Sequence, residues 1–196
     1  WGGFGRFQLR GYRHLDQIIS KVRGNSFRVK KEDCLDLPPK LFETVPVTLT
    51  QKAIDIYREM AKEMIVEIED SHATAAIVLV KLLRLSQITS GFVKDVEGNI
   101  KVFDNSKLNT CMDLVDDLLE EEHKVVIFVR FRHDIDGLHE QLLKRKVQHN
   151  ILSGSVAPHL RDGLVQRFQN DPNVRVFIAQ IQAGSLGIDL TAADAA

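Results

Sequence analysis

The second half of the chain alternates short, mostly apolar stretches with segments whose apolar residues recur every three or four positions. Two such stretches are KVVIFVRF at residues 124–131 and VRVFIAQ at residues 174–180, and the shorter HNIL lies between them at residues 149–152. A strand that is apolar on both sides is buried on both faces, which is typical of a parallel sheet covered by helices. The pattern therefore predicts a parallel sheet from about residue 106 onward.

The segments around these strands predict amphipathic helices, each with one apolar face. Ser106 precedes the first helix, and Pro158 lies near the start of the third. The apolar faces consist of Leu108, Cys111, Met112, Val115, Leu118 and Leu119 in the first helix, Ile135, Leu138 and Leu142 in the second, and Leu160, Leu164 and Phe168 in the third. Helices alternating with buried strands indicate an α/β domain with helices on both faces of the sheet.

The first half follows a different pattern, in which helices dominate. Thr50 is a plausible N-cap for a helix over residues 51–69, where apolar side chains recur at helical spacing. A second helix, over residues 74–89, is apolar nearly all round, so we expect it to pack on two sides and to end at Gly91. A shorter helix is predicted over residues 16–22, a strand over residues 44–49, and a hairpin that turns at residues 98–99.

Composition narrows the classes of function. The longest apolar run, ATAAIVLV at residues 73–80, is too short to span a bilayer, so we expect no membrane segment. The two cysteines and seven histidines lack metal-ligand spacing, so no metal site is predicted. Net charge is −1, but residues 1–31 hold eight Lys or Arg and one acid, a local balance of +7. That arm fits a polyanion partner and a merely solvated tail equally well.

Polar and glycine residues follow the predicted strands at their carboxyl ends, where parallel sheets gather ligands. Arg130 follows the first strand, Ser153 and Gly154 follow the second, and Gln180 begins the segment QIQAGSLGIDL after the third. Such turns suit phosphate contacts, and Arg161 in the next helix would add a charge. They are equally ordinary choices for tight turns. The chain contains no G-x-x-x-x-G-K-[ST] phosphate loop.

Five segments, in order, resemble motifs of the Snf-type DNA translocases, which are helicase-related ATPases of superfamily two. AGSLGIDLTAAD (183–194) resembles a motif of their second RecA-like lobe, although that family usually has glycine at Ser185 and asparagine at Asp189. The others are RVKKEDCLDLPPK (28–40), KLLRLSQITSG (81–91), KVVIFVRF (124–131), and LSGSV (152–156) with Arg161. The resemblance covers residues 28–194, and five collinear motifs make coincidence an unsatisfactory explanation.

The resemblance implies a RecA-like parallel sheet preceded by a mostly helical linker region. It divides the chain into the end of a first lobe and an extended joint (1–50), a helical linker (51–105), and a shortened second lobe (106–196). ATP and Mg²⁺ would bind only together with the first lobe, acting in cis. No catalytic residue is expected here, because the phosphate loop and the arginine finger of such motors would lie outside this chain, which alone should be inactive.

Carried over by position, the resemblance also assigns residues to ligands. Gly187 and Asp189 would approach the ATP ribose. The nucleic-acid backbone would be contacted by Arg130, Ser153, Gly154, Arg161, Gln180 and Gln182, although the family commonly has Ser or Thr at the two glutamine positions. Each residue also has a structural reading: the glycines permit a turn, Asp189 caps a helix, and Arg161 is solvated.

Double-stranded DNA is the partner that the Snf-type resemblance implies. Two other functions stay open: an RNA helicase lobe, favoured by the letters GID at residues 187–189, and a catalytically inactive α/β domain that binds proteins. We expect a bacterial or phage protein in the cytoplasm or nucleoid, or a nuclear one if the source is eukaryotic. The sequence does not indicate an oligomeric state.

Overall fold

The computed structural model describes residues 13–24, 26–27, 29, 40–69, 75–95, 97–184 and 188–196. The chain divides into two units, Trp1–Val45 and Pro46–Ala196. In the first unit, helix α1 (Leu15–Arg23) forms where the sequence predicts a short helix and is followed by Gly24. Cys34 and most of the segment RVKKEDCLDLPPK lie outside the described residues.

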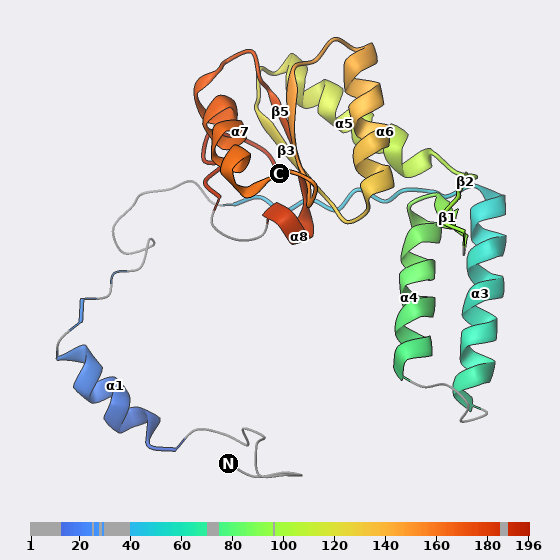
Figure 1. Cartoon of the computed structure of the whole chain (residues 1–196), viewed down its shortest axis with the longest axis horizontal. Coiled ribbons are helices and arrows are strands. Elements are labelled where there is room, and N and C mark those ends of the chain that lie inside the picture. Colours follow the sequence, from blue (N-terminus) through green and yellow to red (C-terminus); the bar gives the residue numbers. More distant parts are fainter. Residues whose placement is uncertain are drawn as a thin grey trace. The chain divides into compact units, whose positions relative to one another are not determined.

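The predicted parallel sheet is confirmed in the second unit. Strands β3 (Val125–Val129), β4 (His149–Leu152) and β5 (Val176–Gln180) are all parallel and lie in the order β3-β5-β4. Helices α5 (Ser106–Glu120) and α6 (Arg132–Lys144) lie on one side of the sheet, and α7 (Pro158–Asn170) lies on the other (Figure 1). The α/β fold with helices on both faces is therefore as expected.

Each face of the sheet has its own hydrophobic core, because successive strand residues point to opposite sides. The core under α5 and α6 contains the buried residues Met112, Val115, Val125, Ile135, Leu138, Leu142, Val176 and Ile178. The core under α7 contains Val126, Leu152, Val165, Phe168, Val174, Phe177 and Ala179. The predicted faces of α5 and α6 are confirmed. In α7, the prediction that Leu160 belongs to the apolar face is wrong. Leu160 lies in the first turn and is 55% exposed, and Val165 is buried instead.

After β5 the chain turns through the short helix α8 (Ile181–Gly184) and returns to the opposite end of β3. On the way, Ile188, Leu190, Ala192 and Ala193 pack against the core under α7. At the return, the Val126 N–H donates to the Ala195 carbonyl over 2.9 Å, and the Lys124 N–H donates to Asp194 Oδ2 over 2.8 Å. Residues 188–195 thus form a crossover that covers the α7 face of the sheet.

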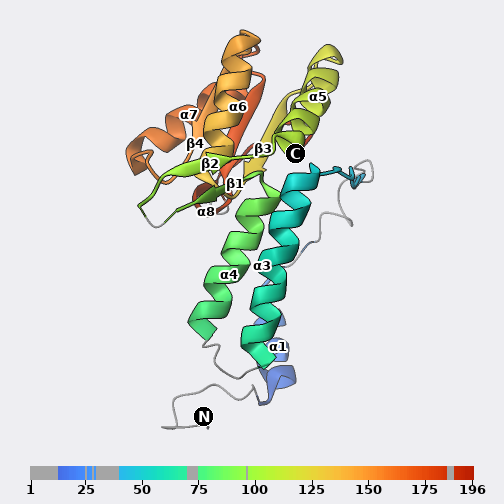
Figure 2. The same ribbon diagram turned by 90° about the vertical axis from the view of Figure 1, so that its right-hand side faces the viewer.

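Two long helices and a small hairpin precede the α/β part within the second unit. Helices α3 (Gln51–Glu69) and α4 (Ala75–Thr89) run side by side in both views (Figure 1 and Figure 2), and β1 (Phe92–Lys94) pairs antiparallel with β2 (Ile100–Val102). The predicted N-cap of α3 is confirmed, since Thr50 Oγ1 accepts the Ala53 N–H over 3.4 Å. The predicted hairpin also forms, with Gly98 at a φ of 95°.

Two expectations for this region are wrong. Helix α4 does not pack on two sides within the described residues: its inner face meets α3, but Leu79, Val80 and Leu83 are exposed. Residues 44–49 form no strand, because no described strand pairs with them. Among the described residues, no helix has both the length and the apolar character needed to cross a membrane.

Asp104 joins the helix pair to the α/β part. Its Oδ2 accepts the Thr50 N–H over 2.8 Å at the start of α3, and its Oδ1 accepts the Ser106 N–H over 2.8 Å at the start of α5. Gly91, at the end of α4, has a φ of 85° and its carbonyl accepts the Asp104 N–H over 3.2 Å. The bases of α3, α4 and α5 are therefore tied together around one residue, with α3 and α5 held by its carboxylate and α4 by its backbone N–H.

Candidate nucleic-acid interface

The carboxyl ends of the three parallel strands bring four of the predicted nucleic-acid residues to one edge. Val129 pairs with Gln180, and Leu152 pairs with Ala179, so the strands end at the same level. Arg130 comes directly after β3, and residues 153–154 come directly after β4. The sheet thus gathers groups that lie up to 50 residues apart in sequence.

Gln180, at the end of the central strand, connects the two neighbouring turns. Its Oε1 accepts the Gly154 N–H over 3.2 Å, and its Nε2 donates to the Arg130 carbonyl over 3.4 Å. The side chain is half-buried between these partners. One donor and one acceptor of the amide are therefore used within the protein.

The exposed side chain of Arg130 is held in place by a residue of the helix pair. Its Nη1 donates to Ser86 Oγ on α4 over 3.2 Å, and its guanidinium carbon lies 5.8 Å from the centroid of the Phe131 ring. Phe131 in turn packs edge-on against Phe92, with centroids 5.4 Å apart. No local signal in the sequence marks Ser86, because it is a serine inside a helix that lies 44 residues before its partner.

The turn after β4 presents hydroxyl and backbone groups. Ser153 is only 6% exposed, and its hydroxyl bonds to that of the exposed Ser155 over 2.8 Å. Arg161, in the first turn of α7, donates through Nε to the Val156 carbonyl over 3.2 Å. Buried Ser153 therefore orients a neighbouring hydroxyl, and Arg161 closes back on the same turn.

The remaining predicted residues are less closely grouped. Gln182 is exposed on α8, just beyond Gln180, and Gly187 lies outside the described residues. Asp189 is exposed; its Oδ1 accepts the Thr191 N–H over 3.1 Å. Its carbonyl accepts a hydrogen bond from Gln169, in the last turn of α7, over 3.0 Å. Since α7 leads away from the edge, the structure does not join Asp189 to the group around Arg130.

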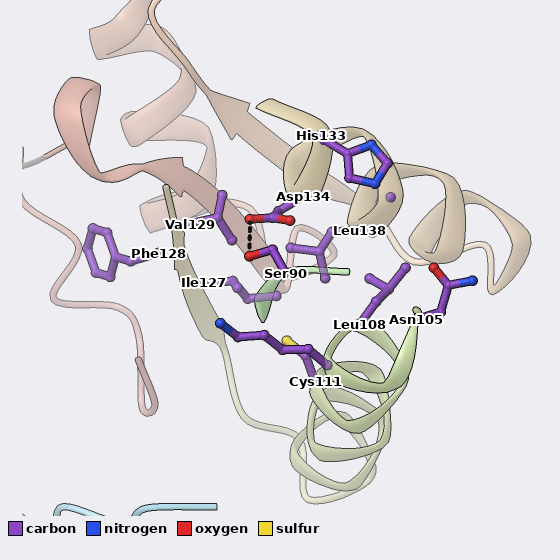
Figure 3. A pocket seen from close by; sticks show the side chains of 12 residues that line it. Ser90, Asn105, Leu108, Cys111, Ile127, Phe128, Val129, His133, Asp134 and Leu138 are labelled. Carbon is purple, nitrogen blue, oxygen red and sulfur yellow. Dashed lines mark hydrogen bonds between the residues drawn. The ribbon is translucent and has the colours of Figure 1, made fainter. Parts of the chain in front are cut away.

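A small pocket lies between β3 and the ends of α4, α5 and α6 (Figure 3). Its volume is about 160 Å³, and its mostly apolar lining includes Leu108, Cys111, Ile127 and Leu138. Ser90 Oγ donates to Asp134 Oδ2 over 3.5 Å at one side of the pocket.

The chemistry of this pocket does not mark it as an active site. Burial raises the pKa of the Asp134 carboxyl, although the nearby charges of His133 and Lys107 act in the opposite direction. Burial also raises the pKa of the Cys111 thiol, which therefore stays protonated and unreactive near neutral pH. In the part of the chain that the structure describes, no cluster of His, Cys, Asp or Glu has the makeup of a metal site.

Comparison with known proteins identifies the class of this fold and edge. Residues 106–196 match the family described as helicase conserved C-terminal domain, so the α/β part of the chain is a helicase lobe. An uncharacterized ATP-dependent helicase of Mycoplasma genitalium is 31% identical over 168 residues, which cover 85% of this chain and 16% of that protein.

Solved structures narrow the class. The C-terminal domain of the Sulfolobus solfataricus SWI2/SNF2 ATPase has a TM-score of 0.59 and 25% identity, covering 74% of this chain and 65% of that one. The same ATPase core in complex with dsDNA has a TM-score of 0.64 and 22% identity, covering 91% of this chain and 39% of that one. Residues 106–196 therefore belong to the helicase C-terminal family, and their counterpart among solved structures is the C-terminal lobe of a Snf-type ATPase. The chain spans about a sixth of the length of the Mycoplasma helicase.

Proposed function

We propose that this chain supplies the second lobe of an ATP-dependent motor that moves along double-stranded DNA. The observation that carries the proposal is the edge where β3, β4 and β5 end, because Arg130 and the turn at residues 153–155 meet there on a Snf-type lobe. Guanidinium, hydroxyl and backbone N–H groups donate the hydrogen bonds that phosphate oxygens accept. The Sulfolobus ATPase core in complex with dsDNA supports duplex DNA as the ligand.

The start of α7 adds to this phosphate-binding character. Ala157, its N-cap residue, makes no side-chain hydrogen bond to the helix, so the first N–H groups have no side-chain cap. Helix N-termini favour anions because their N–H groups are unpaired and the helix dipole is positive there. Arg161 places a cation in that first turn. In this proposal, Gln182 extends the same contact surface along α8.

On the ATP side, we assign Gly187 and Asp189 to the ribose. The Asp189 carboxylate is exposed and holds its own loop through Oδ1. The described residues hold no group of three metal-ligating side chains, and the sequence has no phosphate loop. The first lobe would therefore supply the groups that hold Mg²⁺ and the phosphates, and this chain alone would not hydrolyse ATP.

The mechanism follows from these assignments. ATP binding would draw the two lobes together, and hydrolysis would release them, so that the phosphate contacts of this lobe advance along one strand. Contacts to phosphate carry no base information. Binding should therefore depend steeply on salt and only weakly on DNA sequence.

The test is the ATPase rate of the intact protein with no nucleic acid, duplex DNA, single-stranded DNA or RNA. We expect duplex DNA to stimulate hydrolysis. An Asp189→Ala variant should raise the KM for ATP about tenfold, which corresponds to the loss of a hydrogen bond to a charged group. Asp113→Ala is the matched control, because Asp113 is exposed on α5, on the opposite face of the sheet.

The other outcomes separate the alternatives. Stimulation by RNA alone would assign the protein to the RNA helicases. No hydrolysis under any condition would favour an inactive protein-binding domain. Stimulation by duplex DNA with an unchanged KM in the Asp189→Ala variant would keep the motor but remove the ribose assignment.

A further inference from the structure

Three hydrogen bonds run in series along the candidate interface. They connect Ser86 to the Arg130 side chain, the Arg130 carbonyl to Gln180, and Gln180 to the Gly154 N–H, over 3.2, 3.4 and 3.2 Å. The series begins on α4, crosses the ends of β3 and β5, and finishes at the turn after β4. It therefore links all three strand ends and the helix pair.

The chemistry of Gln180 suits the central place in this series. The two backbone groups that face it are a carbonyl, which only accepts, and an N–H, which only donates. A side-chain amide answers both at once, since its nitrogen donates and its oxygen accepts. This also fixes the orientation of the amide, with Nε2 toward Arg130 and Oε1 toward Gly154.

Arg130 is restrained at both ends as a result. Gln180 holds its carbonyl, and Ser86 holds its guanidinium beside the Phe131 ring. An exposed arginine normally loses much side-chain freedom when it binds a ligand, and that loss weakens binding. An arginine that is already restrained loses less.

We propose that Gln180 is a positioning residue, which sets Arg130 and the Gly154 turn at the spacing that DNA phosphates require, and that Ser86 completes the same function from α4. This inference rests on the proposed function. It differs from the sequence-based expectation for Gln180, in which the glutamine itself contacts the nucleic-acid backbone. Phosphate contact through Arg130 would then depend on Gln180 without Gln180 touching DNA.

The first test needs no DNA. Hydrogen–deuterium exchange is measured on the intact protein, at peptides spanning residues 150–157 and 128–133, for wild type, Gln180→Met and Gln180→Glu. Methionine keeps the length of the side chain but neither hydrogen bond, so exchange should rise at both peptides. Glutamate keeps an acceptor for the Gly154 N–H but has no donor for the Arg130 carbonyl, so the rise should be confined to residues 128–133.

The second test is a double-mutant cycle on duplex DNA affinity, with Gln180→Met and Arg130→Met. We expect Gln180→Met alone to raise the Kd threefold to tenfold, and Arg130→Met to reduce the salt slope by about one. In the Arg130→Met background, Gln180→Met should have less than half of its effect, because only the Gly154 turn is left to position. Ser86→Ala should behave like Gln180→Met, and Gln141→Met on α6 is the control.

The outcomes distinguish the inference from the proposed function. Unchanged exchange in Gln180→Met, or effects on Kd that simply add, would overturn the positioning role; additive effects would instead support direct contact between Gln180 and DNA. A wild-type protein that does not bind duplex DNA would overturn the proposed function and this inference together.

Discussion

Asp104 shows how one buried side chain organises the structure. The carboxylate is 5% exposed and accepts hydrogen bonds from the N–H and the hydroxyl of both Thr50 and Ser106. Burial opposes ionisation, but these hydrogen bonds outweigh it and hold the pKa of Asp104 below its ordinary value. The ionised form is therefore the one that the folded state favours.

An Asp104→Asn variant should lower the free energy of unfolding at neutral pH by about 2–3 kcal/mol, because an amide nitrogen would face donors on one side. The lowered pKa also fixes the sign of the pH dependence. The stabilisation by Asp104 is complete above the pKa that its carboxyl has in the unfolded chain, about 4. It is lost as the pH falls below that value and through the lower pKa of the folded state. The Asp104→Asn variant should therefore lose less stability than the wild type between pH 7 and pH 3. Urea unfolding at a series of pH values measures the free energy of unfolding of both.

Asp95→Asn is the control, because Asp95 also accepts hydrogen bonds with a lowered pKa but is fully exposed in the hairpin loop. Its effect should be small. Equal losses in the two variants would contradict the role given to burial at Asp104.

The sequence predicts the cap at Thr50 from its place before a periodic segment. It does not predict Asp104, since that contact spans 54 residues.

Among the elements, the helices with one apolar face were the most predictable. In α5 and α6 the apolar spacing defines one direction, and those residues are the ones that face the sheet. Helix α4 is apolar nearly all round, so its sequence does not indicate which face is buried. The number of elements that pack against it therefore depends on the tertiary structure. The strand expected at residues 44–49 failed for a related reason: β propensity does not supply a pairing partner.

Two leucines on α4 test its packing. Leu79 is 66% exposed and Leu85 is 7% exposed. Leu79→Gln should change the free energy of unfolding of the chain by no more than about 0.5 kcal/mol, whereas Leu85→Ala should lower it by about 2–5 kcal/mol. Chemical denaturation measures both. A large loss in Leu79→Gln would show that the outer face of α4 is covered within the chain.

For the whole molecule, the sequence predicts which turns carry polar groups but not how they meet. The order β3-β5-β4 places Gln180 between Arg130 and Gly154, and this order is not encoded in any local pattern. Asp189, which the family resemblance assigns to the ATP ribose, bonds to Gln169 of α7 and to Thr191 in the fold. Long-range pairing determines such groupings, and a single sequence contains no direct signal for them.

The joint at Gly91 tests how the helix pair is fixed to the lobe. A Cβ at Gly91 would lie 1.8 Å from the Asp104 carbonyl oxygen, and the residue has a φ of 85°. Gly98 has a φ of 95°, but a Cβ there would meet only the flexible end of Lys94, at 3.5 Å. Gly98→Ala should therefore cost about 1–2 kcal/mol from backbone strain alone, and Gly91→Ala should cost clearly more. Thermal unfolding compares the stability of the two variants. Equal losses of stability would contradict a close contact between Gly91 and Asp104.

Both helices of the pair are fixed to the lobe at their bases, so a rotation of the lobe would carry them with it. Helix α3 has 19 residues, and a helix of that length is a rod about 28 Å long. If the lobe turned by about 10°, the far end of such a rod would sweep roughly 5 Å, which is more than the approximately 3.4 Å rise of one base pair. In the proposed motor, the joint at Asp104 and Gly91 would convert a small rotation of the lobe into a displacement of this size at the far end of α3.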